Sequence, residues 1–284
     1  MSIYTTSPVG DVQLTASPSN HPSGKGKKGK NPKNKGGAPG PPTSGLIVQL
    51  DSTDVTSIYT DIAKTTNPTD GQDVAVWADL SGAGNDFVQS TALDQPSYND
   101  GTHIEGFSSV EAYNTGNSSL QEWLVGPDFS SLTALTFIAY LRVNGASRGG
   151  IWGTTGISHN GTAAHWNYDL NGTKTMFFGA DTGGQGNAHT AWAAGGLPDW
   201  DDAMVYQDSM DTDGTHTAYA NNIEMFNTDK GGPSFRAAGC ILGGCIRAGA
   251  PQYGAHTYFH RFLAYDKVLS AGERARAITW LMAN

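Results

Sequence analysis

Apolar and polar residues alternate in short runs over most of the chain after residue 45, a pattern typical of β-strands. The clearest run spans residues 135–143. Both of its faces carry apolar side chains, so we expect a central strand that is covered on both sides. Further strands are predicted at residues 46–51, 74–77, 175–178 and 258–265.

Residues 215–226 predict a hairpin that turns at Asn221 and Asn222, because asparagine tolerates the positive φ that two-residue turns need. One helix is expected, at the end of the chain. Ser270 is a good N-cap, and Glu273 three residues later completes a capping-box pattern. The apolar face of this helix is expected to consist of Ala275, Ile278, Leu281 and Met282.

Composition favours an all-β fold and separates two segments of opposite charge. Glycine accounts for 37 of 284 residues and charged residues for only 15%, which favours many short strands joined by turns over a helical bundle. Residues 1–45 hold six lysines against one acid, Asp11, and so carry a net charge of +5. Since the whole chain carries −9, residues 46–284 carry −14.

We therefore predict an extended basic Gly/Pro/Lys-rich arm over residues 1–45 and one β-domain over residues 46–284. The arm has too few apolar side chains to form a core, so it is expected to be either a spacer or a segment that docks on a partner. Its candidate docking residues are Lys25, Lys27, Lys28, Lys30, Lys33 and Lys35. The acidic domain is expected not to bind nucleic acid, because such affinity comes mainly from neutralising phosphates.

Neither a membrane span nor a signal peptide is expected, since no apolar run is long enough and residues 1–8 lack a basic start followed by an apolar stretch. Cys240 and Cys245 would lie on opposite faces of one extended strand, roughly 16 Å apart. A disulfide would need a tight turn at Gly243 and Gly244, so we expect free thiols.

Four segments, in their order along the chain, resemble the LamG-like, concanavalin A-like jelly-roll domains. They are a Leu-Asp strand, a V-x-x-W-x-D-x-S-G-x-G-N run, a Gln-Pro-x-Tyr step and a Y-x-x-x-L-S-x-x-E-R run, at residues 48–51, 74–85, 95–98 and 265–274. The resemblance covers residues 46–284 and implies an antiparallel jelly-roll β-sandwich with a short C-terminal helix. It says little about function, because this fold hosts lectins, adhesion modules, glycosidases and structural parts.

We expect no enzyme activity. Laminarinase-like relatives of this fold place paired carboxylates on one strand as E-x-D-x-E, and a retaining glycosidase needs two carboxylates about 5 Å apart. None of the glutamates of this chain belongs to such a motif; they are Glu105, Glu111, Glu122, Glu224 and Glu273. The chain also has no G-x-S-x-G nucleophile elbow.

No cofactor is expected to be required, but two carboxylate-rich turns leave calcium binding open. The first consists of Asp208, Asp211 and Asp213, whose spacing misses the EF-hand pattern. The second consists of Asp79, Asn85 and Asp86. Closing a turn is the alternative role for both groups.

Aromatic and polar side chains gather between residues 152 and 200, and sugar rings stack on the former and hydrogen-bond to the latter. The candidate glycan-binding residues are His165, Trp166, Tyr168, Asn187, Trp192 and Trp200. Core packing is the alternative role for the tryptophans, and it is the role that we expect for Trp77 and Trp152.

The leading hypothesis is a non-enzymatic structural protein at the surface of a bacteriophage virion, either a capsid decoration or a fibre-like component, made in the host cytoplasm. Its arm would dock on other virion proteins and its lectin-like domain would face outward, in many copies or as a homo-oligomer, toward host surface polysaccharide. The alternatives are a tail-tip adhesin that binds host surface glycan and an extracellular polysaccharide-degrading glycosidase or lyase.

Overall fold

The computed structural model of the protein describes residues 39–104, 106–114, 122–129, 131–144, 149–154, 164–170, 173–179, 188–191, 202–213, 215–229, 240–247, 250–252, 254 and 256–283. The six arm lysines lie outside these ranges. The basic arm and its boundary at residue 45 therefore stay predictions.

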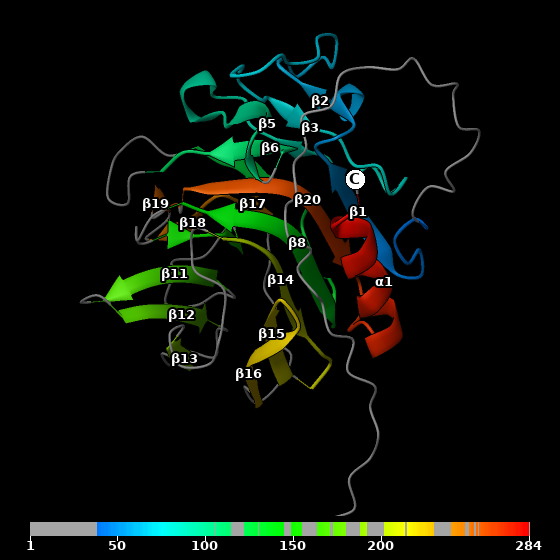
Figure 1. Ribbon diagram of the computed structural model, residues 1–284, viewed down its shortest axis with the longest axis vertical. Coiled ribbons are helices and arrows are strands. Elements are labelled where there is room, and N and C mark those ends of the chain that lie inside the picture. The colour runs from blue at the N-terminus through cyan, green and yellow to red at the C-terminus, as the bar shows by residue number, and fades with distance from the viewer. Residues whose placement is uncertain are drawn as a thin grey trace, which may run out of the picture. The chain divides into compact units, whose positions relative to one another are not determined.

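The larger sheet within the described residues has eight antiparallel strands (Figure 1). Their order is β16-β15-β14-β8-β20-β6-β5, and β1 also pairs with β20. The strands are β1 (Leu46–Asp51), β5 (Ser97–Ile104), β6 (Phe107–Ala112), β8 (Leu135–Val143), β14 (Ala203–Met210), β15 (Thr215–Ala220), β16 (Ile223–Asp229) and β20 (Thr257–Tyr265).

A second sheet has six short strands in the order β10-β17-β7-β4-β3-β2, and the remaining described strands form a four-stranded sheet, β13-β12-β11-β9, and a pair, β18-β19. The second sheet comprises β2 (Ile58–Tyr59), β3 (Val76–Trp77), β4 (Phe87–Val88), β7 (Leu124–Val125), β10 (Trp152–Thr154) and β17 (Cys240–Leu242). The others are β9 (Gly149–Gly150), β11 (Ala164–Leu170), β12 (Thr173–Gly179), β13 (Ala188–Ala191), β18 (Cys245–Arg247) and β19 (Ala250–Gln252). Two 3-10 turns, Val55–Ser57 and Ala92–Asp94, lie in the connections.

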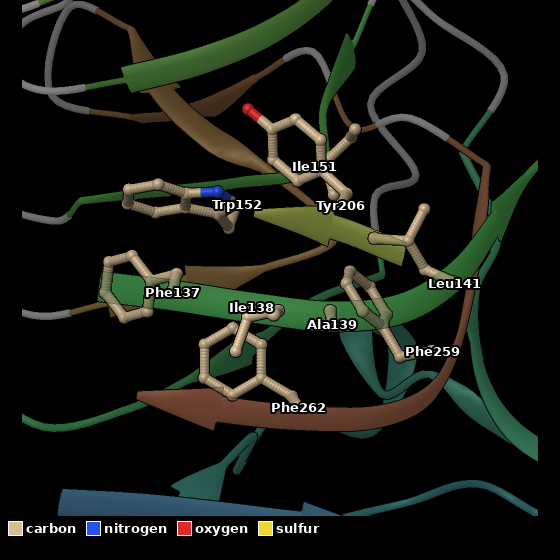
Figure 2. A pocket seen from close by; sticks show the side chains of 9 residues that line it. All are labelled: Phe137, Ile138, Ala139, Leu141, Ile151, Trp152, Tyr206, Phe259 and Phe262. Atoms are coloured by element: carbon tan, nitrogen blue, oxygen red, sulfur yellow. The ribbon is translucent and has the colours of Figure 1, made fainter. Parts of the chain in front are cut away.

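The main core consists of side chains from both the eight-stranded and the six-stranded sheet. Phe137 and Leu141 of β8 point into it, together with Trp77 and Trp152 of the smaller sheet, and all four are buried. The Phe137 and Trp152 ring centroids are 4.1 Å apart, and the space among the side chains drawn in Figure 2 leaves no room for a water-sized molecule. The predicted antiparallel β-sandwich and the core role of both tryptophans are confirmed.

The local strand predictions hold where the pattern is strong. Both β8 and β1 begin and end at the predicted residues, whereas the strand predicted at 74–77 shrinks to β3 and the one at 175–178 lengthens into β12. The predicted turn is confirmed, since Asn221 and Asn222 have φ values of 46° and 66°. Asn221 also accepts a hydrogen bond from the Val205 backbone through its side chain, which ties the turn to β14.

The cysteine segment does not continue as one strand. The backbone turns at Gly243, where φ is +82°, and β17 and β18 belong to different sheets. A Cβ atom at this position would lie 2.4 Å from the Cβ atom of Ala112, so only glycine fits here. Cys240 is free, as predicted, and fully buried.

The predicted helix is present as α1 (Ala271–Leu281), and its capping box between Ser270 and Glu273 is confirmed. Its buried face differs from the prediction, because Ala275 and Met282 are exposed. The residues of α1 that are buried are Ala277, Trp280 and Leu281. The helix is rotated in this way because the Trp280 ring packs on the guanidinium of Arg261, 4.7 Å from the ring centroid. No helix within the described ranges is long and apolar enough to cross a membrane.

Candidate functional site

The outer face of the larger sheet, which is turned away from the main core, has two ends of different character. At the first, which we call the helix end, Leu263 and Tyr265 of β20 and Ile138 of β8 pack in one cluster with Trp280 and Leu281 of α1. The second lies at the other end of β20, around an exposed ring. We call it the Tyr113 end and define it as Asn99, Glu111, Tyr113, Glu122, His256 and Tyr258.

A bulge in β20 determines which side chains lie at the helix end. The register of β20 against β8 shifts between Phe259 and Arg261, so the intervening His260 is an extra residue in the ladder. Bulges re-aim side chains. As a result both His260 and Arg261 lie on the outer face, the first against the Phe107 ring and the second against Trp280.

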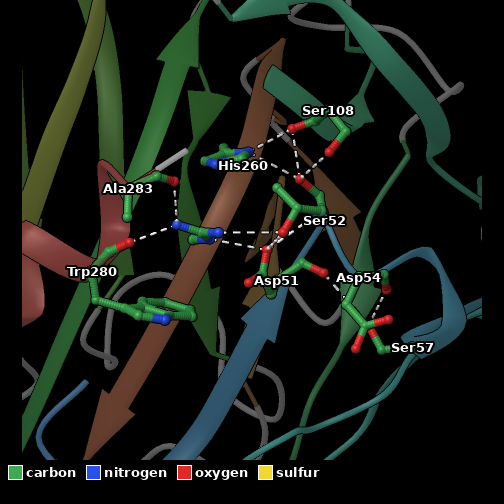
Figure 3. Close-up of polar contacts among 10 residues, drawn as sticks. Asp51, Ser52, Asp54, Ser57, Ser108, His260, Trp280 and Ala283 are labelled. Atoms are coloured by element: carbon green, nitrogen blue, oxygen red, sulfur yellow. Dashed lines mark hydrogen bonds and ion pairs between the residues drawn. The ribbon is translucent and has the colours of Figure 1, made fainter. Parts of the chain in front are cut away.

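Arg261 joins the helix to the sheet (Figure 3). Its Nη1 donates hydrogen bonds to the carbonyl oxygens of Trp280 (2.6 Å) and Ala283 (2.7 Å), at the C-terminal end of α1. Its Nε lies 2.9 Å from Oδ1 of Asp51 on β1, and both side chains are nearly buried. A cation at a helix C-terminus satisfies carbonyl groups that lack partners within the helix, so this contact holds α1 in place.

His260 is buried beside Arg261 and stays neutral. Burial, with a smaller contribution from the charge of Arg261, lowers the pKa of His260 to about 4. Its Nδ1 lies 2.7 Å from the carbonyl oxygen of Ser108, to which it donates, and 3.1 Å from Oγ of Ser52. Because the ring is fully buried, it serves the packing of the helix end and offers no surface to a ligand.

The strand register brings the Tyr113 end together. Tyr258 pairs with Glu111 of β6 on one side and with Arg142 of β8 on the other. Side chains two positions apart on a strand share a face. His256 therefore lies next to Tyr258, and Tyr113 lies next to Glu111, on the same outer face. Two pairs of residues from distant segments of the sequence thus become neighbours.

Direct contacts fix the geometry of these neighbours. Nε2 of His256 lies 2.6 Å from Oε1 of Glu111, and Nδ2 of Asn99 donates to the other oxygen at 2.7 Å. The Tyr113 ring meets the His256 ring nearly edge to face, with centroids 4.7 Å apart, and the Tyr258 ring lies 5.0 Å beyond. Tyr113 is 50% exposed, so one aromatic ring of a fixed stack is open to solvent.

The two glutamates of this end differ in acidity. Burial raises the pKa of Glu111, but hydrogen bonds from His256, Asn99 and Tyr258 outweigh it and hold that pKa at about 2. Glu122 has a pKa of about 7, because burial raises it and the charges of Glu111 and Asp73 add to that effect. Glu111 is therefore ionised at neutral pH, whereas Glu122 is divided between its two forms.

Glu122 is held in place by the chain around Tyr113. Its Oε2 accepts a hydrogen bond from the Tyr113 backbone at 2.8 Å, and its backbone N–H donates to Oδ1 of Asn114 at 3.1 Å. Nδ2 of Asn114 in turn donates to the carbonyl oxygens of Glu122 and Gly243. These bonds tie the carboxyl group to the backbone of the residue that carries the exposed ring.

An exposed aromatic ring beside fixed carboxylate, amide and imidazole groups can stack on an apolar ring face and hydrogen-bond to hydroxyl groups at its edge. Glu111 and Glu122 are neighbouring carboxyl groups with different pKa values, and such pairs often occur at functional sites. The Tyr113 end is therefore the candidate binding site among the described residues.

The glycan-binding residues predicted from the sequence lie elsewhere or are not described. His165, Trp166 and Tyr168 are on β11 of the four-stranded sheet, and the structure describes their backbone only. Asn187, Trp192 and Trp200 lie outside the described residues. All six stay predictions.

The carboxylates proposed for calcium are spread along one strand and its turn. Asp208 is buried in β14, opposite Phe137. Asp211 accepts hydrogen bonds from the backbone of Asp213 (3.1 Å) and Thr215 (2.9 Å) and so closes the turn between β14 and β15.

The second oxygen-rich turn is closed in the same way, since Oδ2 of Asp79 accepts from the Asn85 backbone and Oδ1 of Asp86 accepts from the Asp79 backbone. Within the described ranges no three acidic, histidine or cysteine side chains come together as metal ligands. Calcium binding stays a prediction.

Sequence reasoning missed the Tyr113 end. Glu111 and Glu122 match no single-strand carboxylate motif, and no sequence pattern singles out His256 or Tyr113. One local signal was present, because the alternation through β6 places Glu111 and Tyr113 on the same face. The contact with His256 spans 145 positions, and no sequence spacing reveals it.

No family model matches the chain, and no curated protein sequence matches it. Solved structures share its fold. The binding domain of Paraclostridial Mosquitocidal Protein 1 aligns with a TM-score of 0.51 and 11% identity over 83% of this chain and 52% of that one. The binding domain of botulinum neurotoxin DC, solved with rat synaptotagmin II, aligns with a TM-score of 0.51 and 9% identity over 83% and 51%.

A botulinum neurotoxin type C structure aligns with a TM-score of 0.52 and 8% identity over 83% of this chain and 50% of that one. The uptake of that toxin into cells depends on interaction with two ganglioside molecules. This chain thus spans about half the length of each of these three structures. At these identities the likeness shows a common β-sandwich fold.

Proposed function

We propose that this protein is a non-enzymatic carbohydrate-binding module whose Tyr113 end contacts a glycan. The observation that carries the proposal is the half-exposed Tyr113 ring, fixed against His256 and bordered by the hydrogen-bonding groups of Glu111. Rigid aromatic rings bind sugar faces at little entropic cost, and the polar groups around them fix the orientation of the ligand.

The fold agrees with this role without proving it, because one sandwich architecture serves many functions. A structural neighbour depends on gangliosides, which carry sugar head groups, and the sequence segments that resemble LamG-like domains point to the same broad class. Both are analogies. The residues of the Tyr113 end make the proposal specific to this chain.

The test is a glycan array probed with three forms of the full chain: the natural protein, Tyr113→Ala and Tyr59→Ala. Tyr59 is a partly buried tyrosine of β2, in the other sheet, and serves as the matched control. We expect Tyr113→Ala to weaken binding about tenfold and Tyr59→Ala to leave it unchanged. Equal binding by all three forms would place the ligand elsewhere, for example on β11.

The same array ligand tests the absence of catalysis. If the protein only binds, incubation with the corresponding polysaccharide releases no reducing ends beyond those of a protein-free control. Release that disappears in Glu122→Gln would instead assign a glycosidase, with Glu122 as the acid and Glu111 as the second carboxylate.

The setting that we propose is the surface of a bacteriophage virion, with host surface polysaccharide as the partner. The contrast in charge supports it, since an arm of +5 precedes a domain of −14 and suits docking on a neighbouring acidic protein. The full chain and a chain that begins at Gly45 are mixed with virions that lack this protein. Binding by the full chain alone supports the arm as the docking segment, and hundreds of copies per particle would indicate capsid decoration over a tail-tip adhesin.

A further inference from the structure

The charged groups that act on Glu122 include more carboxylates than cations. Glu122 has neighbours on three elements. Glu111 and Tyr113 lie at the end of β6, Asp73 lies in the loop that bridges to β5, and His256 lies in the segment before β20. Two of these groups are carboxylates, and the ring of His256 is already committed to Glu111 at 2.6 Å. Among the described residues, no lysine, arginine or histidine forms an ion pair with Glu122.

This carboxyl group is also fixed in place. Its Oε2 accepts from the Tyr113 backbone, and the Asn114 side chain clamps the backbone of Glu122 from both sides. A carboxylate that is half-buried, held rigidly and near two like charges is stabilised by any cation that reaches it. Moving the side chain toward bulk water would require breaking the bond to Tyr113.

The exposed ring beside this carboxyl group favours the same kind of ligand. The face of a tyrosine ring carries negative potential and attracts an ammonium group within about 6 Å of its centroid. Tyr113 is 50% exposed and directly follows the strand that carries Glu111. A ligand that brings one positive charge to this exposed ring also approaches the Glu122 carboxyl group, which is hydrogen-bonded to the backbone of the same tyrosine.

We propose that the Tyr113 end selects glycans that carry an ammonium group, and that Glu122 is the specificity-determining residue. This inference rests on the proposed function and narrows its ligand class. Neutral sugars bring no counter-charge to Glu122, and sialylated sugars bring a further negative charge to a domain that already carries −14.

The probes are three oligosaccharides, titrated by calorimetry into the full chain at pH 8. The first is a glucosamine oligomer with trimethylated amines, which keeps its positive charge at every pH. The second is the N-acetylated oligomer of the same length, which is neutral, and the third is sialyllactose, which is anionic. We expect the trimethylated oligomer to bind at least tenfold more tightly than the acetylated one, and sialyllactose not to bind.

Glu122→Gln removes the charge and keeps the shape of the side chain. It should bring the affinity for the trimethylated oligomer down to that for the acetylated one. Glu224→Gln is the matched control, since Glu224 is an exposed glutamate on β16 at the opposite edge of the sheet. That variant should bind as the natural protein does.

A pH series on the natural protein gives a second readout that needs no variant. With a pKa of about 7, Glu122 is mostly protonated at pH 6 and mostly ionised at pH 8. The trimethylated oligomer should therefore bind about tenfold more tightly at pH 8 than at pH 6, because only the ionised form is competent. The acetylated oligomer should show no such rise.

Two results would overturn the inference. One is equal or tighter binding of the acetylated oligomer or of sialyllactose, which leaves the proposed function intact. The other is a failure of all three probes to bind. If the glycan array then yields a different ligand that Tyr113→Ala loses, only the inference falls, and if the array yields none, the proposed function falls with it.

Discussion

The helix end and the Tyr113 end of the outer face are built around the same kind of contact. Arg261 lies 2.9 Å from Asp51 at the first, and His256 lies 2.6 Å from Glu111 at the second. At the helix end the donors left over from the ion pair bind the carbonyl groups of α1. At the Tyr113 end the aromatic ring next to the pair is half exposed.

Under the proposed function, this difference divides one sheet face between an end that stabilises the fold and an end that binds a ligand. At the helix end, the polar groups of the Arg261 guanidinium are used within the fold, so a ligand would gain nothing there. At the Tyr113 end, the fold fixes the ring and two carboxyl groups and leaves Glu122 without an ion pair among the described residues. Polar groups that are fixed in advance but incompletely paired are what a binding site offers to a ligand.

The largest effect is expected at the helix end. Arg261→Met leaves Asp51 buried without its cation, and breaking one partner of such a pair costs about 3 kcal/mol or more. Urea unfolding should therefore show a loss of that size, with glycan binding preserved in the folded protein. Arg276→Met is the control, since Arg276 is exposed on α1 and should change stability by less than about 0.5 kcal/mol. Similar losses in both variants would contradict the role given to Arg261.

The next effect is expected at the Tyr113 end and depends on pH. The pKa of Glu122 is raised in the folded protein to about 7 from a usual 4.5, so the folded state binds the proton more tightly than the unfolded chain does. Its contribution to stability is complete below pH 4.5 and is lost as the pH rises through 7. At pH 8, Glu122→Gln should therefore be more stable than the natural protein by roughly 1–2 kcal/mol, after allowance for solvent screening.

Thermal unfolding between pH 5 and pH 8 measures this difference. The gain from Glu122→Gln should shrink toward pH 5. Glu224→Gln is measured alongside as the control. A gain that is the same at every pH would mean that the carboxyl group is not strained by its neighbours.

A smaller effect is expected at the N-terminus of α1. The Ser270 hydroxyl accepts a hydrogen bond from the Glu273 backbone N–H, and the Glu273 carboxylate accepts one from the Ser270 backbone N–H at 3.0 Å. Ser270→Ala should lower the free energy of unfolding by about 1 kcal/mol and leave glycan binding unchanged. If binding falls in parallel with stability, the two ends of the face are coupled and the distinction between them is wrong.

Structural features that depend on neighbouring residues could be predicted from the sequence. The period of two in residues 135–143, the paired asparagines at 221 and 222 and the capping box at Ser270 each determine a nearby backbone geometry, and all three are found in the structure. The buried face of α1 was predicted only in part: Leu281 and Ile278 pack against the sheet, whereas Ala275 and Met282 are exposed because the contact with Arg261, on a distant strand, orients the helix. The β20 bulge that places Arg261 there leaves no mark in the hydrophobic pattern.

The Tyr113 end could not be predicted for a related reason. Its members come from β5, β6, β20 and the residues before β7, and they meet only because β6 and β20 pair antiparallel with Glu111 opposite Tyr258. Register between distant strands follows from the packing of the whole sandwich. The aromatic groups between residues 152 and 200 are close together in sequence, which is a weaker criterion for a binding site than closeness in space.

The most direct test is a histidine NMR titration of the full chain with the glycan chosen on the array. Three side-chain signals, assigned by single substitution, report on three places: His256 at the Tyr113 end, His260 at the helix end and His165 on β11. The predicted result is that the His256 signal moves with ligand and saturates at the affinity found by calorimetry, while the other two stay fixed. Movement of His165 with a stationary His256 would contradict the assignment of the Tyr113 end as the binding site.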